Sequence, residues 1–111
     1  MMKMCKRKRA WLYCRIAEID SFSMRMQVEE LRRYAAERGY TIIGVTQEYG
    51  NGLSLDRYGL SEVVMAVENN HACIALVKGA SRIARRTDHL LEFIRTLREY
   101  GASLESIFGE V

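Results

Sequence analysis

The chain has 111 residues, of which 49% are hydrophobic and 28% are charged, and its formal net charge is +3. These values are typical of one folded domain with a single hydrophobic core, here residues 1–111, and they exclude a disordered chain. No apolar run approaches the roughly 18 residues that a membrane span requires, and the basic start lacks the apolar core of a secretory signal. We therefore expect a cytoplasmic protein without membrane contact.

The cysteines and histidines predict no metal or cofactor site. Cys5, Cys14 and Cys73 are an odd number without CxxC spacing, so reduced thiols are expected rather than disulfides. His71 and His89 fall in different segments, each without a paired ligand. We expect neither a metal ion nor a small-molecule cofactor.

The first elements of the chain are a strand and a helix. Residues 10–16 are short, apolar and bounded by charge, which is typical of a buried strand. The next segment has helical spacing, begins at a cap formed by Ser21 or Ser23, and runs to Arg38. Gly39 supplies the left-handed residue that ends this helix.

A second strand, a loop and a second helix follow. Residues 40–46 are β-branched and continuously apolar, which predicts another buried strand. Residues 47–57 hold several glycines and little periodicity, so they form a loop that is long enough to favour a functional role. The next helix carries its apolar face at Leu60, Val63, Val64 and Val67.

The last third repeats the alternation. Residues 72–77 predict the clearest buried strand, and residues 79–86 predict a basic loop or short turn. Thr87 or Asp88 caps a strongly amphipathic helix that Gly101 closes, and residues 103–107 form a short final strand. The resulting fold class is α/β, with three layers and a mainly parallel sheet of four to five strands flanked by helices.

Basic residues gather where predicted strands end. Arg15 lies at the end of the first strand, and Arg82, Arg85 and Arg86 follow the third. Ligands of open parallel sheets bind outside the carboxyl ends of the strands. Arg82 and Arg85 are three residues apart and point the same way on a helical turn, and phosphate is the natural partner of converging guanidiniums. Another basic cluster, within residues 1–9, is compatible with a polyanionic partner or with a solvated, flexible start.

An ordered series of motifs spans nearly the whole chain. Its pieces are Tyr13-Cys14-Arg15-Ile16-Ala17, then Gln27 within residues 24–31, Tyr34-Ala35 with Gly39-Tyr40, Gly52 with Asp56-Arg57-Tyr58-Gly59-Leu60, and Ser81-Arg82-Ile83-Ala84-Arg85. In order and spacing the series resembles the catalytic domain of the serine recombinases, the resolvase and invertase family. That resemblance implies a resolvase-like fold and a role in DNA recombination, in a mobile element or prophage.

The resemblance also implies roles for particular residues. The scissile DNA phosphate and its pentacoordinate transition state are held by Arg15, Arg57, Arg82 and Arg85. Arg86 adds a further phosphate contact, and Gln27 supports the site from the first helix. In the family, a serine hydroxyl attacks DNA, forms a phosphoserine link and frees a 3′-hydroxyl, and strand exchange and religation follow. The implied partners are DNA and either a second copy of this chain or a full-length recombinase.

This chain departs from the family pattern at the residue that attacks. The position of the nucleophilic serine is Ala17, so we expect no covalent link and no strand cleavage. Tyr58 stands where the family has proline, and Ser81 where it has aspartate. The acidic residue that the family has at the end of the second strand is displaced, with Gln47 or Glu48 nearby. Ser21 and Ser23 suit helix caps, and Cys14 points into the core, so none of these replaces the serine.

Two other functions are compatible with the same residues. The chain could be a non-catalytic module that binds DNA phosphates or regulates an active recombinase. It could also be a small enzyme acting on a phosphorylated metabolite, which ranks last because no glycine-rich phosphate fingerprint follows the first strand. The sequence ends soon after Ile107, where family members continue into a long dimer helix and a DNA-reading domain, so both are expected to be absent.

Overall fold

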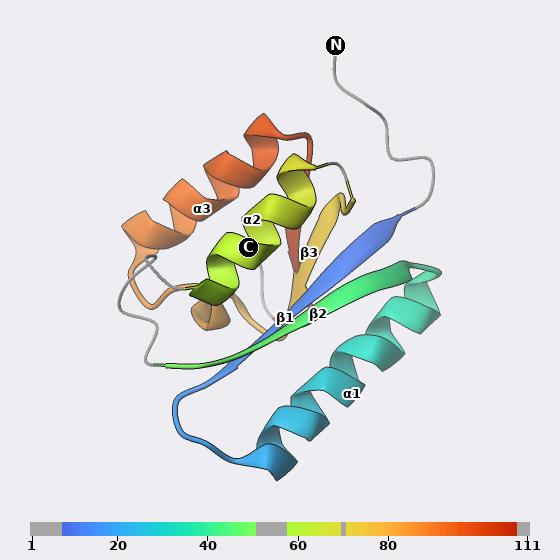
Figure 1. Ribbon diagram of the computed structural model, residues 1–111, viewed down its shortest axis with the longest axis vertical. Helices are drawn as coiled ribbons and strands as arrows, with labels where there is room; N and C mark the ends of the chain where they lie inside the picture. The colour runs from blue at the N-terminus through green and yellow to red at the C-terminus, as the bar shows by residue number, and fades with distance from the viewer. Residues whose placement is uncertain (1–7, 51–57, 70, 109–111) are drawn as a thin grey trace.

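The computed structural model describes residues 8–50, 58–69 and 71–108. Strands and helices alternate along the chain (Figure 1). In order, the elements are β1 (Arg9–Ile16), α1 (Ser21–Arg38), β2 (Thr41–Tyr49), α2 (Tyr58–Glu68), β3 (Ile74–Val77), the 3-10 turn η1 (Ala80–Arg82), α3 (Thr87–Glu99) and β4 (Ser103–Ser106). No helix among these residues is long and apolar enough to cross a membrane.

The four strands form one sheet in the order β2-β1-β3-β4, and every pairing is parallel. Helix α1 covers one face, and α2 and α3 cover the other (Figure 1). The predicted three-layer α/β fold with a parallel sheet is therefore confirmed. The chain crosses from β1 through α1 to β2 on one side, and continues to β3 and β4 on the other side of β1, so the strand order reverses between β1 and β3.

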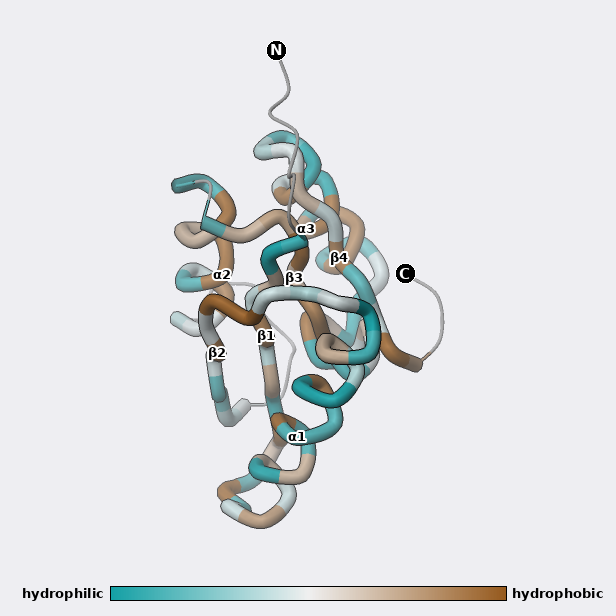
Figure 2. Tube along the Cα trace, turned by 90° about the vertical axis from the view of Figure 1, so that its right-hand side faces the viewer, coloured by the Kyte–Doolittle hydropathy of each residue, from teal (hydrophilic) through white to brown (hydrophobic). Residues whose placement is uncertain are grey.

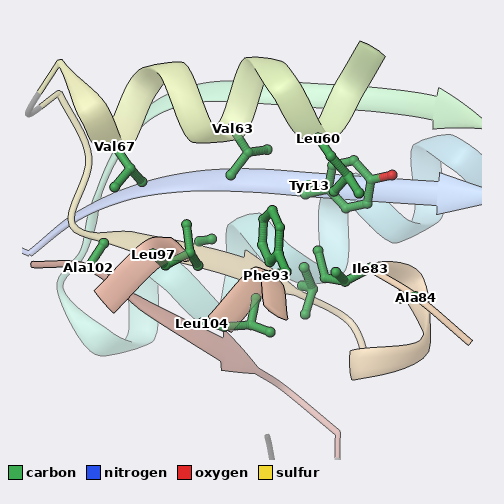
Figure 3. Packing of buried hydrophobic residues seen from close by; sticks show 12 residues of the cluster. Tyr13, Leu60, Val63, Val67, Ile83, Ala84, Phe93, Leu97, Ala102 and Leu104 are labelled. Carbon is green, nitrogen blue, oxygen red and sulfur yellow. The ribbon is translucent and has the colours of Figure 1, made fainter. Parts of the chain in front are cut away.

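The alternation of side chains along β1 explains why both faces of the sheet are apolar. Leu12 and Cys14 point toward α1, whereas Tyr13 points toward α2 and α3. On the second face, side chains from α2 and α3, among them Val63 and Phe93, converge on the sheet (Figure 3). Burial on both faces is typical of parallel strands whose crossovers place helices on each side.

Helix α1 shows why an amphipathic segment settles on the sheet. Its buried apolar residues recur at helical spacing: Met24, Val28, Leu31 and Ala35. Hydrophilic residues alternate with them along the helix (Figure 2). Gly39 has φ 75° and ends the helix, as predicted, because this left-handed conformation carries little cost only for glycine.

The predicted helix caps were wrong. The N-cap of α1 is Asp20, whose carboxylate accepts hydrogen bonds from the Phe22 and Ser23 backbone N–H groups. The Ser23 hydroxyl donates to the same carboxylate at 2.8 Å, and this bond lowers the pKa of Asp20. At α3 the cap position is Arg86 without a side-chain cap bond, and Thr87 is already helical. Aspartate and serine cap helices equally well. The residue types alone therefore do not show whether Asp20, Ser21 or Ser23 is the N-cap of α1.

The predictions for β2 also need correction. The strand runs to Tyr49, into the predicted loop, because it pairs with β1 as far as Ile16. It lies at an edge of the sheet, and Thr46 is its only buried residue. Between Ala10 and Trp11 the register shifts, so that Ile43 has no partner on β1 and Gly44 stands opposite Trp11. Such a bulge bends an edge strand and re-aims its side chains.

The cysteines divide into two cases. Cys14 is a free thiol and fully buried, as predicted. Cys73 is disulfide-bonded, so the expectation of reduced thiols is wrong for this residue. An odd number of cysteines rules out complete pairing, but it does not rule out a single bridge.

Candidate active-site cleft

A cleft of about 230 Å³ opens at the carboxyl ends of β1 and β3, where the strand order reverses. The end of β1 contributes Arg15, Ile16 and Ala17, and the segment after β3 contributes Ser81, Arg82 and Arg85. The crevice at such a reversal point is where open parallel sheets bind ligands. None of the described residues that line the cleft is acidic, so its three guanidiniums give it a strong positive potential.

Arg15 is committed to the protein backbone. Its side chain is 4% exposed. The guanidinium donates from Nε to the Arg82 carbonyl at 2.7 Å, from Nη1 to the Gly50 carbonyl at 2.5 Å, and from Nη2 to the Ser81 carbonyl. One cation thus ties the end of β1 to the end of β2 and to η1. We assign Arg15 the role of a positioning residue, since these bonds fix the backbone on both sides of the cleft.

Gln27 supports the same strand end from α1. Its side chain is 3% exposed, its Oε1 accepts from the Arg15 N–H at 3.1 Å, and its Nε2 donates to the Arg15 carbonyl at 3.3 Å. Strand β3 pairs with β1 at residues Ala10 to Leu12 and not further along β1. The Gln27 amide therefore takes the place that a longer β3 would occupy beside Arg15.

Arg82 and Arg85 both line the cleft, although η1 ends at Arg82 and no regular helix joins them. Between them, Ile83 and Ala84 are buried in the core beneath α2 and α3. Anchoring the middle of the segment directs the flanking arginines outward. The Nε of Arg82 is buried and has no hydrogen-bond partner among the described residues. Since an unsatisfied buried donor costs about 1–3 kcal/mol, this atom suits an anionic ligand.

Ala17 lies at the cleft but offers only a methyl group. It is exposed and lines the same cavity as Arg82. The nearby alternatives are unsuited to attack: Ser23 is engaged with the Asp20 carboxylate, and the Cys14 thiol is buried. Burial raises the pKa of Cys14 to about 12, against smaller lowering effects of Arg32 and Arg82. A thiol with this pKa is protonated at neutral pH and is a poor nucleophile.

The predicted set is only partly gathered here. Arg86 does not line the cleft; it forms a bidentate pair with Asp88, at 3.0 and 2.7 Å, which lowers the pKa of that carboxyl group. Arg57 lies outside the described residues, as do Gly52 and Asp56. Within the described ranges, no group of three or more histidine, cysteine or acidic residues could hold a metal ion.

Sequence reasoning missed the part that Glu48 plays. Its carboxylate accepts hydrogen bonds from the Tyr13 hydroxyl and, at 2.7 Å, from the Gly59 N–H at the start of α2. A Cβ atom on Gly59 would lie 2.7–2.8 Å from the carboxylate atoms, so glycine permits this approach. Glu48 joins β1, β2 and α2 through one side chain. The sequence carries a signal for this contact, because Glu48 lies near the end of the second strand and Gly59 belongs to the motif series.

The geometry defines an α/β domain with a cationic cleft suited to a phosphate group. The family model of the resolvase N-terminal domain matches residues 10–110. The chain therefore belongs to the resolvase N-terminal domain family.

Solved structures have the same fold. The C-terminal catalytic domain of ISC1926 TnpA, an IS607-like serine recombinase, is 26% identical with a TM-score of 0.84, over 92% of this chain and 69% of that one. A serine recombinase from Sulfolobus solfataricus is 23% identical with a TM-score of 0.76, over 96% and 71%. A resolvase family site-specific recombinase from Streptococcus pneumoniae is 20% identical with a TM-score of 0.78, over 91% and 72%. The fold is that of serine recombinase catalytic domains.

Proposed function

We propose that this chain is a serine recombinase catalytic domain that binds DNA phosphate in the arginine cleft and does not cleave the strand. The observation that carries the proposal is the pairing of two features in one cavity. The buried Nε of Arg82 has no partner within the described ranges, and Ala17 stands at the position that the family resemblance gives to the nucleophile. The cleft thus has the groups that hold a phosphate and lacks the oxygen that attacks it.

The chemistry shows what the alanine removes. In the family reaction, a serine oxygen forms a bond to phosphorus, the bond from phosphorus to the 3′ oxygen breaks, and that oxygen leaves as a hydroxyl. Arginine donors stabilise the charge that develops on the phosphoryl oxygens. Ala17 has no oxygen to form the first bond, so in this chain Arg82 and Arg85 would bind the phosphate diester in its ground state only.

DNA binding tests the first half of the proposal. Binding of a short labelled duplex, followed by fluorescence anisotropy, should weaken as salt rises, because bound phosphates release counterions. Arg82→Ala should weaken binding and reduce the salt slope by about 1. The matched control is Arg95→Ala, which removes one exposed positive charge of α3 away from the cleft. Equal affinity and slope for Arg82→Ala and the unmodified chain would contradict the proposal.

Restoring the nucleophile tests the second half. The unmodified chain should form no covalent adduct with DNA under conditions in which an active serine recombinase does. Ala17→Ser should form one that survives denaturing electrophoresis, and adding Arg82→Ala to that variant should abolish it. An adduct formed by the unmodified chain would refute the proposal.

The alternative, a non-catalytic binding or regulatory module, is favoured by the further departures at Tyr58 and Ser81. It predicts that Ala17→Ser binds DNA as the unmodified chain does and still forms no adduct. It also predicts that the chain changes the activity of a recombinase with which it is mixed. Those two results together would select the regulatory role over a domain inactivated by Ala17 alone.

A further inference from the structure

A second cavity, of about 350 Å³, has no described lining residue in common with the arginine cleft. Its walls include Trp11 from β1, side chains of α2 such as Tyr58, Glu62 and Met65, and His71 just after α2. Cavities of this size accept small organic groups. Nothing in the recombinase proposal uses it.

Trp11 forms a fixed platform in this cavity. Gly44 stands opposite it because of the bulge in β2. A Cβ atom at Gly44 would lie 2.2–2.5 Å from carbons of the six-membered indole ring, so the ring rests directly on the Gly44 backbone. The indole N–H donates to the Thr46 hydroxyl at 2.8 Å. An aromatic ring held at two points is ordered before any ligand arrives.

Glu62 supplies charge beside the platform. The Thr46 hydroxyl donates to Glu62 Oε1, so one chain of hydrogen bonds runs from the indole through Thr46 to the carboxylate. The second carboxylate oxygen has no partner in the described part of the chain. Among the described residues that line the cavity, Glu62 is the one acidic residue, and none is a lysine or an arginine. On a chain of net charge +3, this is a local site for a cation.

We propose that this cavity binds a guanidinium group, carried by a small molecule or by an arginine side chain of a polypeptide. A guanidinium is planar and stacks on an aromatic face, and it also bonds a carboxylate through a fixed pair of N–H groups. An ammonium is also attracted to an aromatic face, but it is not planar and does not bond a carboxylate through a fixed pair of N–H groups. Met65 and Tyr58 are 60% and 88% exposed, and they provide apolar surface for the methylene chain that bears the guanidinium.

The single tryptophan of the chain makes this site directly observable. The emission of Trp11 and its one indole N–H resonance should change saturably with N-acetyl-arginine amide. N-acetyl-citrulline amide, which has nearly the same shape but no charge, should bind at least about tenfold more weakly. The lysine analogue should fall between them. Equal, non-saturating responses to all three compounds would overturn the proposal.

Matched variants locate the binding. Glu62→Gln keeps an oxygen that accepts from Thr46 but removes the charge, so the affinity for the arginine probe should fall about tenfold. Glu92→Gln removes an equivalent exposed charge from α3, outside this cavity, and should bind normally. If both variants lose affinity equally, the effect is one of net charge and the proposal fails.

Two further probes separate the sources of the guanidinium. Agmatine carries the group on an alkyl amine without a peptide bond, whereas a blocked Gly-Arg-Gly peptide carries it on a backbone. Tighter binding of the peptide assigns the site to a polypeptide partner, and equal or tighter binding of agmatine assigns it to a small molecule. Failure of both to bind refutes the site, and it leaves the DNA-binding proposal unaffected because the described residues that line the two cavities are different.

Discussion

The arginine cleft and the cavity beside Trp11 both include residues of β1, but the cleft is lined by arginines and the cavity contains the Glu62 carboxylate. In the cleft, the Arg15 guanidinium is engaged as a support, and Arg82 Nε has no hydrogen-bond partner in the described part of the chain. In the cavity, Trp11 is held by Gly44 and Thr46, while one Glu62 oxygen has no partner among the described residues. In both places one group fixes the geometry, and another has hydrogen-bonding capacity that no described residue uses. Substituting a support should therefore lower stability, and substituting a binding group should lower affinity alone.

The largest expected effect is that of Arg15→Met. Removing a buried guanidinium leaves three backbone carbonyls without their donor, and hydrogen bonds to charged groups are individually strong. The free energy of unfolding, measured by urea denaturation, should fall by about 4 kcal/mol. Arg85→Met, at an exposed cleft position, should change it by no more than about 0.5 kcal/mol. Similar losses for the two variants would remove the distinction between support and binding group.

Next in size is Gln27→Leu. The substitution keeps an apolar contact but removes the two hydrogen bonds that Gln27 forms with the buried Arg15 N–H and carbonyl. We expect the free energy of unfolding to fall by about 3 kcal/mol. Hydrogen exchange at the Arg15 amide should also accelerate. If exchange at this amide is unchanged, the side chain does not serve as a substitute strand.

The loss of stability in Gly44→Ala should be smaller than in Gln27→Leu, but the effect should be specific to Trp11 and its cavity. The added methyl group meets the indole ring, so Trp11 must move, at a cost of about 2 kcal/mol. The emission of Trp11 should shift, and the arginine probe should bind more weakly. Gly79→Ala is the matched control, because a Cβ atom there meets nothing within 4 Å. An unshifted emission in Gly44→Ala would mean that the platform is not held as described.

The smallest effect concerns pH. Burial raises the pKa of Cys14 from 9.0 to about 12, so the unfolded chain releases this proton first as pH rises. The stabilisation is complete below pH 9 and is lost as pH rises toward 12. Between pH 8 and 10 the free energy of unfolding should fall by about 1 kcal/mol through this group. Cys14→Ala should be less stable throughout but should show a shallower decline; an equally steep decline would contradict the assignment.

The sequence was sufficient for the parts that depend on local pattern. Apolar segments placed β1, β3 and the helices correctly, and parallel strand ends predicted that Arg82 and Arg85 would lie near Arg15. The phosphate-binding roles of these arginines remain predictions.

What sequence reasoning missed depends on register. The extension of β2 to Tyr49 follows from its pairing with Ile16, and no feature of residues 47–49 announces it. The Trp11 platform depends on one unpaired residue, Ile43, which decides that a glycine stands opposite the ring. The use of Arg15 by three carbonyls depends on where β2 and η1 end. These features depend on how segments that are distant in the sequence align in the fold, so local sequence patterns do not reveal them.

The amide of Gln27 has a consequence for the shape of the sheet. Only three residues of β1 pair with β3, yet the backbone beside the cleft is still hydrogen-bonded, through Gln27. The Gln27 side chain, which comes from α1, thus forms the hydrogen bonds that a further residue of β3 would otherwise form with β1. Strands β1 and β3 can therefore separate here while the Arg15 backbone stays hydrogen-bonded. The opening between the two strands is the arginine cleft.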